Sequence, residues 1–343
     1  MRTAFLVPVL VAAVALGQDL PLTQADAVEA ALSRQPRLRE AEARLRAAAA
    51  REDQARLGRL GSLSTSIAWT PFQRGQRIDV PGFGGEEPES FEVRQTERLA
   101  LGVNLSQPIW TWGALSSQLR SAQEEREAIR QAGDRARQQL VFDVTRAFAT
   151  AVAADETEDV ARRDRAQREE LLRVARSRVE AAAAAPLDAL QAEVALAEAE
   201  SALLQAANRR RLSREALVAL TVDDRFRTGS LAPPPDSDEP PPAEDEAVAV
   251  ARAGRSDLAS LRAQVGSLGA GAAASRASGR PALSLQASLT QQHESASRLL
   301  DARGRLYQVG LAVSWDPVGR ARAKCRAAAL ESLAQAQRAT LAA

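Results

Sequence analysis

The pattern of apolar and polar positions begins with helical spacing and later changes to strict alternation. Residues 26–60 carry apolar or small side chains three and four positions apart, with Thr23 as a candidate N-cap. Proline has no backbone N–H and cannot continue a helix, so Pro36 predicts a break. We therefore expect one long, interrupted helix over residues 26–60.

From Leu63 the period changes to two, which is typical of a β-strand with two different faces. The alternation returns at residues 99–105, where leucine and valine alternate with small and polar residues. The stretch 71–90 between them is rich in Gly, Pro and Glu, which predicts a long loop. Together these segments should form a β-hairpin with a large exposed loop.

Two long helical segments follow this hairpin. No proline occurs between Pro108 and Pro186, and a helix of that extent reaches roughly 100 Å. After Pro186, residues three and four apart predict a coiled-coil seam formed by Leu187, Leu190, Val194, Ala197, Ser201 and Leu204. We expect an antiparallel helical hairpin that turns at residues 181–186, in preference to a bundle of ordinary short helices.

The helix and strand pattern then recurs at a constant offset. Leu63 matches Leu283 and Leu38 matches Leu258, a shift of 220 in both cases (283 − 63 = 258 − 38 = 220). A repeat of this length predicts a tandem duplication, with further strands at 283–290 and 307–315. The predicted divisions are a signal peptide (1–17), a first repeat (18–222), a Pro-rich acidic linker (223–243) and a second, incomplete repeat (244–343).

The N-terminus has the features of an export signal. Arg2 precedes an apolar stretch, and Ala15-Leu16-Gly17 is a small-x-small cleavage site before Gln18. A retained membrane anchor is the weaker alternative, because this apolar stretch is too short to span a bilayer comfortably.

The second repeat ends earlier than the first. From Gly113 to Val222 the first repeat has 222 − 113 = 109 residues, whereas 343 − 319 = 24 residues follow the matching Gly319. By this comparison 109 − 24 = 85 residues of a second helical hairpin are missing. We therefore expect a C-terminally truncated chain, whether a fragment, a frameshifted product or a natural variant, that would not form a normally gated tunnel.

Composition narrows the possible functions. Only 3% of the 343 residues are aromatic, which argues against a large globular core. Lys+Arg 45 nearly balances Asp+Glu 44, so no basic field indicates nucleic acid, and Arg209-Arg210-Arg211 is interpreted as a solvated helix face. One cysteine and one histidine exclude an internal disulfide and multi-histidine or multi-cysteine metal sites. We expect no catalytic, cofactor-binding or metal-binding residues.

The predicted strands have the alternation of transmembrane barrel strands, apolar toward lipid and polar toward a lumen. Aromatic residues at or near strand ends would meet the lipid headgroups: Trp69, Trp110, Trp112, Tyr307 and Trp315. The lumen-facing set would be Asn104, Ser106, Gln286, Ser288 and Ser314. A soluble β-sandwich has the same alternation and stays open as an alternative. Four strands cannot close a barrel, so several chains would have to contribute strands.

Three stretches, in this order and spacing, resemble the outer-membrane efflux protein family of TolC-like channels. They are Gln107-Pro108-Ile109 with Gly113, Arg178-Val179-Glu180 leading into residues 186–193, and Arg280-Pro281-Ala282-Leu283-Ser284-Leu285. The resemblance implies a mainly α fold with a small β part: long antiparallel coiled-coil helices and four transmembrane β-strands per chain. It also implies a homotrimeric α/β barrel in the outer membrane, with the helical part as a tunnel in the periplasm.

The resemblance further implies the partners. These are outer-membrane lipid, a periplasmic adaptor (membrane fusion protein) and an inner-membrane pump, in a tripartite efflux or type I secretion system that exports small molecules or proteins. No nucleic acid partner is expected. The alternative is a secreted or periplasmic coiled-coil scaffold without channel activity, and an enzyme is not expected.

The same resemblance implies that the adaptor docks at the tip of the helical hairpin, which comprises Arg178, Val179, Glu180, Ala182, Pro186, Leu187 and Asp188. For Arg178 and Glu180 a solvated ion pair is the alternative role. Two positions depart from the family: Ala182 stands where glycine is common, and Asp316-Pro317-Val318-Gly319 is two residues shorter than the corresponding segment.

Overall fold

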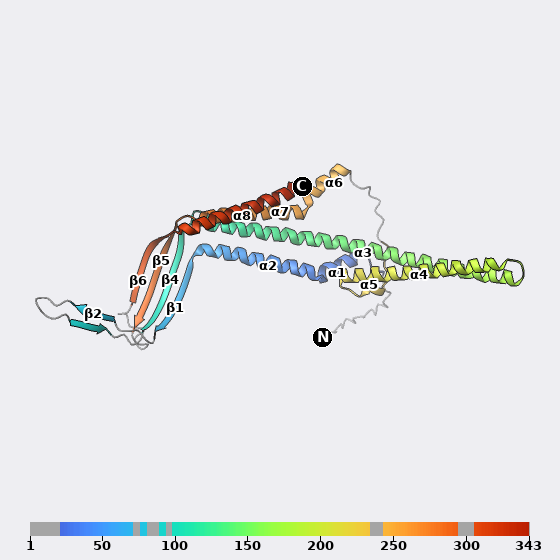
Figure 1. Ribbon diagram of the computed structural model, residues 1–343, viewed down its shortest axis with the longest axis horizontal. Coiled ribbons are helices and arrows are strands. Elements are labelled where there is room, and N and C mark those ends of the chain that lie inside the picture. Colours follow the sequence, from blue (N-terminus) through green and yellow to red (C-terminus); the bar gives the residue numbers. More distant parts are fainter. Residues whose placement is uncertain are drawn as a thin grey trace, which may run out of the picture. The chain divides into compact units, whose positions relative to one another are not determined.

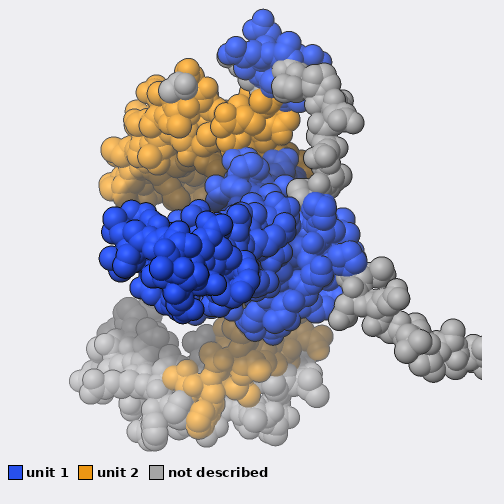
Figure 2. Space-filling view, turned by 90° about the vertical axis from the view of Figure 1, so that its right-hand side faces the viewer, with its two compact units in different colours: residues 1–41, 134–250 blue, residues 42–133, 251–343 orange. Residues whose placement is uncertain are grey.

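The computed structural model describes residues 21–70, 76–80, 89–93, 98–233, 243–293 and 305–342. The predicted signal peptide and residues 234–242 of the predicted linker lie outside this part. The chain forms two compact units, one of residues 1–41 and 134–250 (unit 1) and one of residues 42–133 and 251–343 (unit 2) (Figure 2).

Long helices dominate both units (Figure 1). They are α1 (Gln24–Arg34), α2 (Pro36–Leu57), α3 (Ala114–Glu180), α4 (Pro186–Thr221), α5 (Arg225–Thr228), α6 (Glu244–Gly254), α7 (Ser256–Ser278) and α8 (Pro317–Ala342), with a 3-10 turn at Gly58–Leu60. At 67 residues α3 is about 100 Å long, as predicted. The mainly helical fold with a small β part is confirmed.

The predicted start and break of the first helical segment are both present. The Thr23 hydroxyl accepts the Asp26 backbone N–H at 3.2 Å, and the Asp26 carboxylate accepts the Thr23 backbone N–H at 2.9 Å. This capping box satisfies two backbone donors at the start of α1. Gln35 is extended, with ψ 122°, because a residue before proline is disfavoured in the helical region. Pro36 then begins α2.

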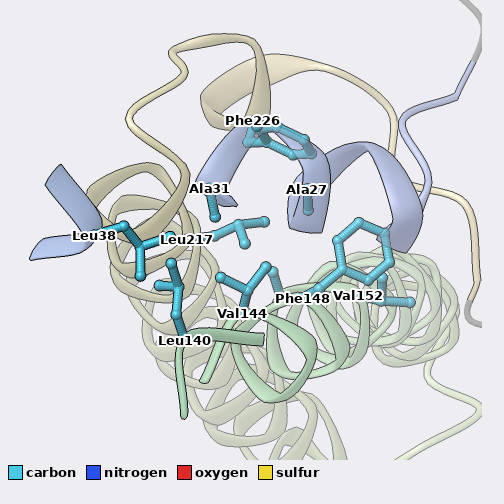
Figure 3. Close-up of a cluster of buried hydrophobic side chains, with 11 residues drawn as sticks. Ala27, Ala31, Leu38, Leu140, Val144, Phe148, Val152, Leu217 and Phe226 are labelled. Carbon is cyan, nitrogen blue, oxygen red and sulfur yellow. The ribbon is translucent and has the colours of Figure 1, made fainter. Parts of the chain in front are cut away.

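The core of unit 1 forms where α1 lies across α3 and α4. Figure 3 shows Ala27 and Ala31 of α1 facing Phe148 of α3 and Leu217 of α4, with Phe226 of α5 close by. All five are fully buried or nearly so. Alanine on α1 leaves space for the two phenylalanine rings, and burying such a side chain contributes about 2 to 3 kcal/mol. This cluster anchors the base of the helical hairpin.

The predicted coiled-coil seam of α4 is wrong by two positions. Leu187, Leu190, Val194 and Leu204 are 53–69% exposed. The buried or half-buried residues are instead Ala189, Ala192, Leu196, Ala199, Leu203 and Ala206. Both sets follow heptad spacing, so spacing could not choose between them. The alanine-rich set lies inside because small side chains let two helices approach closely.

Unit 2 contains a four-stranded antiparallel sheet in the order β1-β4-β5-β6 (Figure 1). The strands are β1 (Ser62–Thr70), β4 (Arg98–Trp110), β5 (Ala282–His293) and β6 (Arg305–Ser314). The four predicted strands are thus confirmed. Gly61 leads into β1 with φ 79°, and a Cβ there would lie 2.4 Å from the Ser106 carbonyl oxygen, so this turn requires glycine.

One loop prediction is wrong. The predicted loop 71–90 contains β2 (Gln76–Val80), which pairs antiparallel with β3 (Glu89–Val93) in a separate two-stranded sheet. Ile78 pairs with Phe91, and both lie in short alternating runs. The surrounding glycines and prolines concealed this alternation in the sequence.

Equivalent elements of the two sequence repeats keep the predicted offset. Helices α1 and α6 begin at residues 24 and 244, α2 and α7 begin at 36 and 256, and β1 and β5 begin at 62 and 282. Each pair differs by 220. The helix, helix and strand of the first repeat therefore recur in order, and the domain boundaries drawn from this repeat stay a prediction.

Candidate functional site

The register of the four-stranded sheet separates polar from apolar side chains. Residues paired directly across antiparallel strands point to the same side. Asn104 pairs with Ser64 and with Ser288, and Ser106 pairs with Gln286. The residues predicted to face a lumen therefore share one side, which we call the polar face: Asn104, Ser106, Gln286, Ser288 and Ser314.

The opposite side, which we call the apolar face, exposes large hydrophobic side chains. The most exposed aliphatic side chains belong to the outer strands β1 and β6: Leu63, Ile67, Val309, Leu311 and Val313, each 67–76% exposed. Contact of apolar surface with water costs about 25 cal/mol per Å². A contiguous apolar patch of this kind marks an interaction surface, so this face requires an apolar environment.

Aromatic side chains lie toward both ends of the apolar face. Trp69 pairs with Leu99 near one end of the strands, and Tyr307 pairs with Leu289 on the same side. Trp110 ends β4 at the opposite end, and Trp315 directly follows β6 there. All four of these aromatic side chains are exposed.

A β-bulge sets the direction of Trp110. Pro108 pairs with Ser284, but the next pair joins Trp110 to Leu283, so Ile109 is an extra residue in β4. In a regular strand the even-numbered Trp110 would point to the polar face with Pro108. The bulge moves it to the side of Leu283.

Trp112 joins the end of β4 to the start of β5. Its indole Nε1–H donates to the Pro281 carbonyl oxygen at 2.7 Å, and the Arg280 guanidinium lies 5.3 Å from its ring centroid. The Trp112 ring also meets the Trp110 ring edge to face at 5.8 Å. A cation over an indole face is attracted by the ring quadrupole. The Arg280 interaction was not predicted from the sequence, because it joins residues 168 positions apart (280 − 112).

The tip of the helical hairpin turns through a left-handed alanine. Ala182 has φ 54°, its N–H donates to the Val179 carbonyl at 3.0 Å, and the Ala183 N–H donates to the Arg178 carbonyl at 2.8 Å. These two bonds form a Schellman motif, which usually has glycine at the left-handed position. The return helix begins at Pro186, the favoured first helical residue.

The residues predicted for docking are together at this tip. Arg178, Val179 and Glu180 form the last turn of α3, and Pro186, Leu187 and Asp188 form the first turn of α4. All are exposed except the half-buried Val179. Within the described residues, neither the Arg178 guanidinium nor the Glu180 carboxylate forms an ion pair. The tip therefore presents a cation, an anion and the apolar Leu187 to solvent.

At the base of the hairpin, two arginines of α4 bind the Asp155 carboxylate of α3. Arg214 is 4% exposed and bonds both carboxylate oxygens, while Arg210 donates to one of them at 2.9 Å. The Arg214 guanidinium also donates to the Gly229 carbonyl at 2.7 Å. The interpretation of the Arg209-Arg210-Arg211 cluster as a solvated face is therefore wrong for Arg210.

A buried carboxylate, Asp223, follows α4. Asp223 accepts from Arg225 at 2.9 Å and lies 2.8 Å from the Arg34 guanidinium of α1. The hydrogen bond from Arg225 holds the pKa of Asp223 below its ordinary value. These contacts fasten the end of α4 to α1.

Two further observations concern membranes and metals. No helix within the described ranges is both long and apolar enough to cross a membrane. In the same ranges, no three metal-ligating side chains converge.

Solved structures share this fold at low sequence identity. A membrane protein from Pseudomonas aeruginosa matches with a TM-score of 0.74 and 21% identity, over 93% of this chain and 72% of that protein. The outer membrane protein VceC from Vibrio cholerae matches with a TM-score of 0.75 and 19% identity, over 93% and 74%. The CmeC outer membrane channel from Campylobacter jejuni matches with a TM-score of 0.75 and 17% identity, over 92% and 68%. No curated protein sequence matches the chain.

The fold is that of TolC-like outer-membrane channels. In sequence, the family model described as "Outer membrane efflux protein" matches residues 27–221, more than half of the chain. The chain therefore belongs to the outer membrane efflux protein family, as its motifs predicted. It is an outer-membrane channel subunit of tripartite efflux systems.

Proposed function

We propose that three copies of the chain form one twelve-stranded barrel in the outer membrane, with the apolar face toward lipid and the polar face toward the lumen. This proposal rests on the two faces of the sheet, one apolar and one polar. Its outer strands, β1 and β6, each have one unpaired edge within the described sheet. In lipid such edges must be paired. Since neighbouring strands alternate in direction, β6 of one copy can pair antiparallel with β1 of the next.

The spacing of the aromatic residues supports this placement. Tyr307 and Trp315 are 315 − 307 = 8 positions apart, or about 27 Å along an extended strand. A strand inclined by roughly 40° would separate them by about 21 Å across the membrane, close to the apolar band of about 25 Å in such barrels. The rings would then lie at the two headgroup layers.

The polar face suits a water-filled passage. Asn104, Ser106, Gln286, Ser288 and Ser314 carry no charge at neutral pH. They can form hydrogen bonds with water and with polar solutes without repelling either sign of ion. We propose that cargo leaves the periplasm through this lumen.

We further propose that the helical hairpin lies in the periplasm and that its tip docks a periplasmic adaptor, which joins the channel to an inner-membrane pump. TolC-like channels in general work as trimers with such partners. The exposed residues of the tip, from Arg178 to Asp188 in the chain, offer charged and apolar contacts on a short turn. The chain would then serve transport rather than catalysis.

Cysteine cross-linking between copies tests the barrel. In a C325S background, Ser64→Cys on β1 would be combined with Gln308→Cys, Gly310→Cys or Ala312→Cys on β6. All four positions lie on the polar face. At least one pair should give disulfide-linked trimers in outer-membrane fractions, whereas each single variant should not. Recovery of only monomers from every pair would contradict the proposal.

A further inference from the structure

Three basic side chains line a groove at the helical end of the sheet. Arg280 precedes β5, and Arg320 and Lys324 lie in the first turns of α8. Together with the end of α7 they enclose a volume of about 300 Å³. Gly279 allows α7 and α8 to approach here, because a Cβ at this position would lie 3.3 Å from the Arg320 Cα. We call this feature the basic groove, defined by Arg280, Arg320 and Lys324.

The charges of the basic groove are not neutralised within the described part of the chain. The fourth cation on its wall, Arg276, forms an ion pair with Glu331. None of the other three forms an ion pair with a described carboxylate, and all three are exposed. The groove therefore holds three cations that lack a carboxylate partner, because Glu331, the carboxylate that also lines it, is paired with Arg276. Such a cluster of like charges attracts anions.

Ring contacts place the groove on the lipid side of the proposed channel. The Arg280 guanidinium lies over the Trp112 ring, and that ring meets Trp110. Trp110 points to the apolar face, through its pairing with Leu283. Aromatic rings at the ends of membrane strands lie at the level of the lipid headgroups. The basic groove is thus next to this aromatic level, where phospholipids carry their phosphates.

We propose that the basic groove binds the phosphate of an anionic phospholipid headgroup. The proposal rests on the proposed membrane placement of the sheet. The two guanidinium groups can each form paired hydrogen bonds to phosphate oxygens, and the lysine adds a compact point charge. The lipid would hold two junctions at the membrane surface, the one from α7 into β5 and the one from β6 into α8.

Native mass spectrometry of the purified mature protein in detergent, with phosphatidylglycerol as the probe, tests this site. The test variant is R320Q/K324Q. The matched control R326Q/R338Q removes two charges from the same helix outside the groove. We expect the test variant to bind phosphatidylglycerol about thirtyfold more weakly, from the attraction of two basic side chains to anionic lipid. The control should change less than threefold, and phosphatidylcholine should bind all three proteins equally.

Each other outcome has a definite meaning. An equal loss in both double variants would show general charge attraction and overturn the site, as would unchanged binding in R320Q/K324Q. Displacement of the lipid by millimolar inorganic phosphate would overturn the lipid assignment in favour of a soluble anion. Bilayer conductance of the same samples separates the two proposals. Absent conductance with groove-dependent lipid binding would contradict the channel assembly and support the groove.

Discussion

Arg214 of α4 and Asp155 of α3 form a two-bonded ion pair at the base of the helical hairpin. The same guanidinium bonds the carbonyl oxygens of Phe226, Arg227 and Gly229, so one side chain fastens α3, α4 and the segment after α4. Arg214 is almost fully buried. Removing it would leave the Asp155 carboxylate with one partner fewer, and three carbonyl groups would lose their bonds to Arg214.

Replacing Arg214 by glutamine should therefore destabilise unit 1 strongly. Breaking one partner of a buried ion pair costs about 3 to 5 kcal/mol. Thermal unfolding of the purified protein should show a clearly lower midpoint for Arg214→Gln. The control is Arg211→Gln, an exposed arginine three residues away. Equal midpoints for the two variants would contradict the role of Arg214.

The hairpin tip offers a stabilising substitution. A non-glycine residue in the left-handed region costs about 1 to 2 kcal/mol of stability. Glycine in place of Ala182 removes this cost, but the greater freedom of glycine in the unfolded chain offsets part of the gain. Ala182→Gly should slow amide hydrogen exchange at residues 178–188 by roughly threefold. Ala181→Gly, at a neighbouring position without positive φ, should speed exchange instead. Faster exchange in Ala182→Gly would show that the turn differs from the one described.

Acid should loosen the contact between α1 and the end of α4. The pKa of Asp223 is lowered in the folded protein by its hydrogen bond from Arg225. A lowered carboxyl pKa contributes stability that is complete above the ordinary value near 4 and is lost as the pH falls through the folded value. At pH 7, Asp223→Asn should cost about 2 kcal/mol, as for hydrogen bonds to charged groups.

The pH dependence of the stability lost in Asp223→Asn is a sharper test. The difference in unfolding midpoint between the wild type and Asp223→Asn should be constant from pH 7 to about pH 5 and should shrink below about pH 4. Asp224→Asn is the matched control, since Asp224 is exposed and pairs with Arg227 on the surface. A difference that grows as the pH falls would contradict the assigned sign.

Sequence patterns predicted the elements of this fold better than their contacts. The period of two located the four strands of the sheet, and long proline-free stretches located α3 and α4. Thr23 marked the start of a helix and Pro36 marked a break, and both features depend only on neighbouring residues. The apolar and polar faces of the sheet also follow directly from alternation, so the shared side of Asn104 and Ser288 was predictable.

Features that depend on choosing between equivalent patterns were not predictable. Two heptad stripes two positions apart run along α4, and only packing against α3 decides that Ala199 is buried and Val194 is exposed. The pairing of Arg214 with Asp155 joins helices across 59 positions, for which local spacing carries no signal. The strands β2 and β3 were hidden by the glycines and prolines between them.

The two faces of β6 offer a direct test of the barrel, because Val309 and Gly310 are neighbours on opposite faces. Val309 is 74% exposed on the apolar face, and a Cβ added at Gly310 would meet nothing within 4 Å. A lysine can therefore be placed on either face. On the lipid face of a barrel a lysine costs about 2 to 4 kcal/mol at the membrane centre and about 0 to 1 kcal/mol near the surfaces, so the cost at Val309, two positions from Tyr307, lies between these values. In a lumen a lysine alters ion selectivity.

The decisive measurement is the reversal potential of single channels in planar bilayers under a salt gradient, for the wild type, Val309→Lys and Gly310→Lys. We expect Gly310→Lys to form channels whose reversal potential shifts toward anion selectivity. We expect Val309→Lys to yield fewer channels and less outer-membrane protein than Gly310→Lys, because its lysine would face lipid. Normal assembly of Val309→Lys with a shifted reversal potential, together with failed assembly of Gly310→Lys, would contradict the assignment of the two faces.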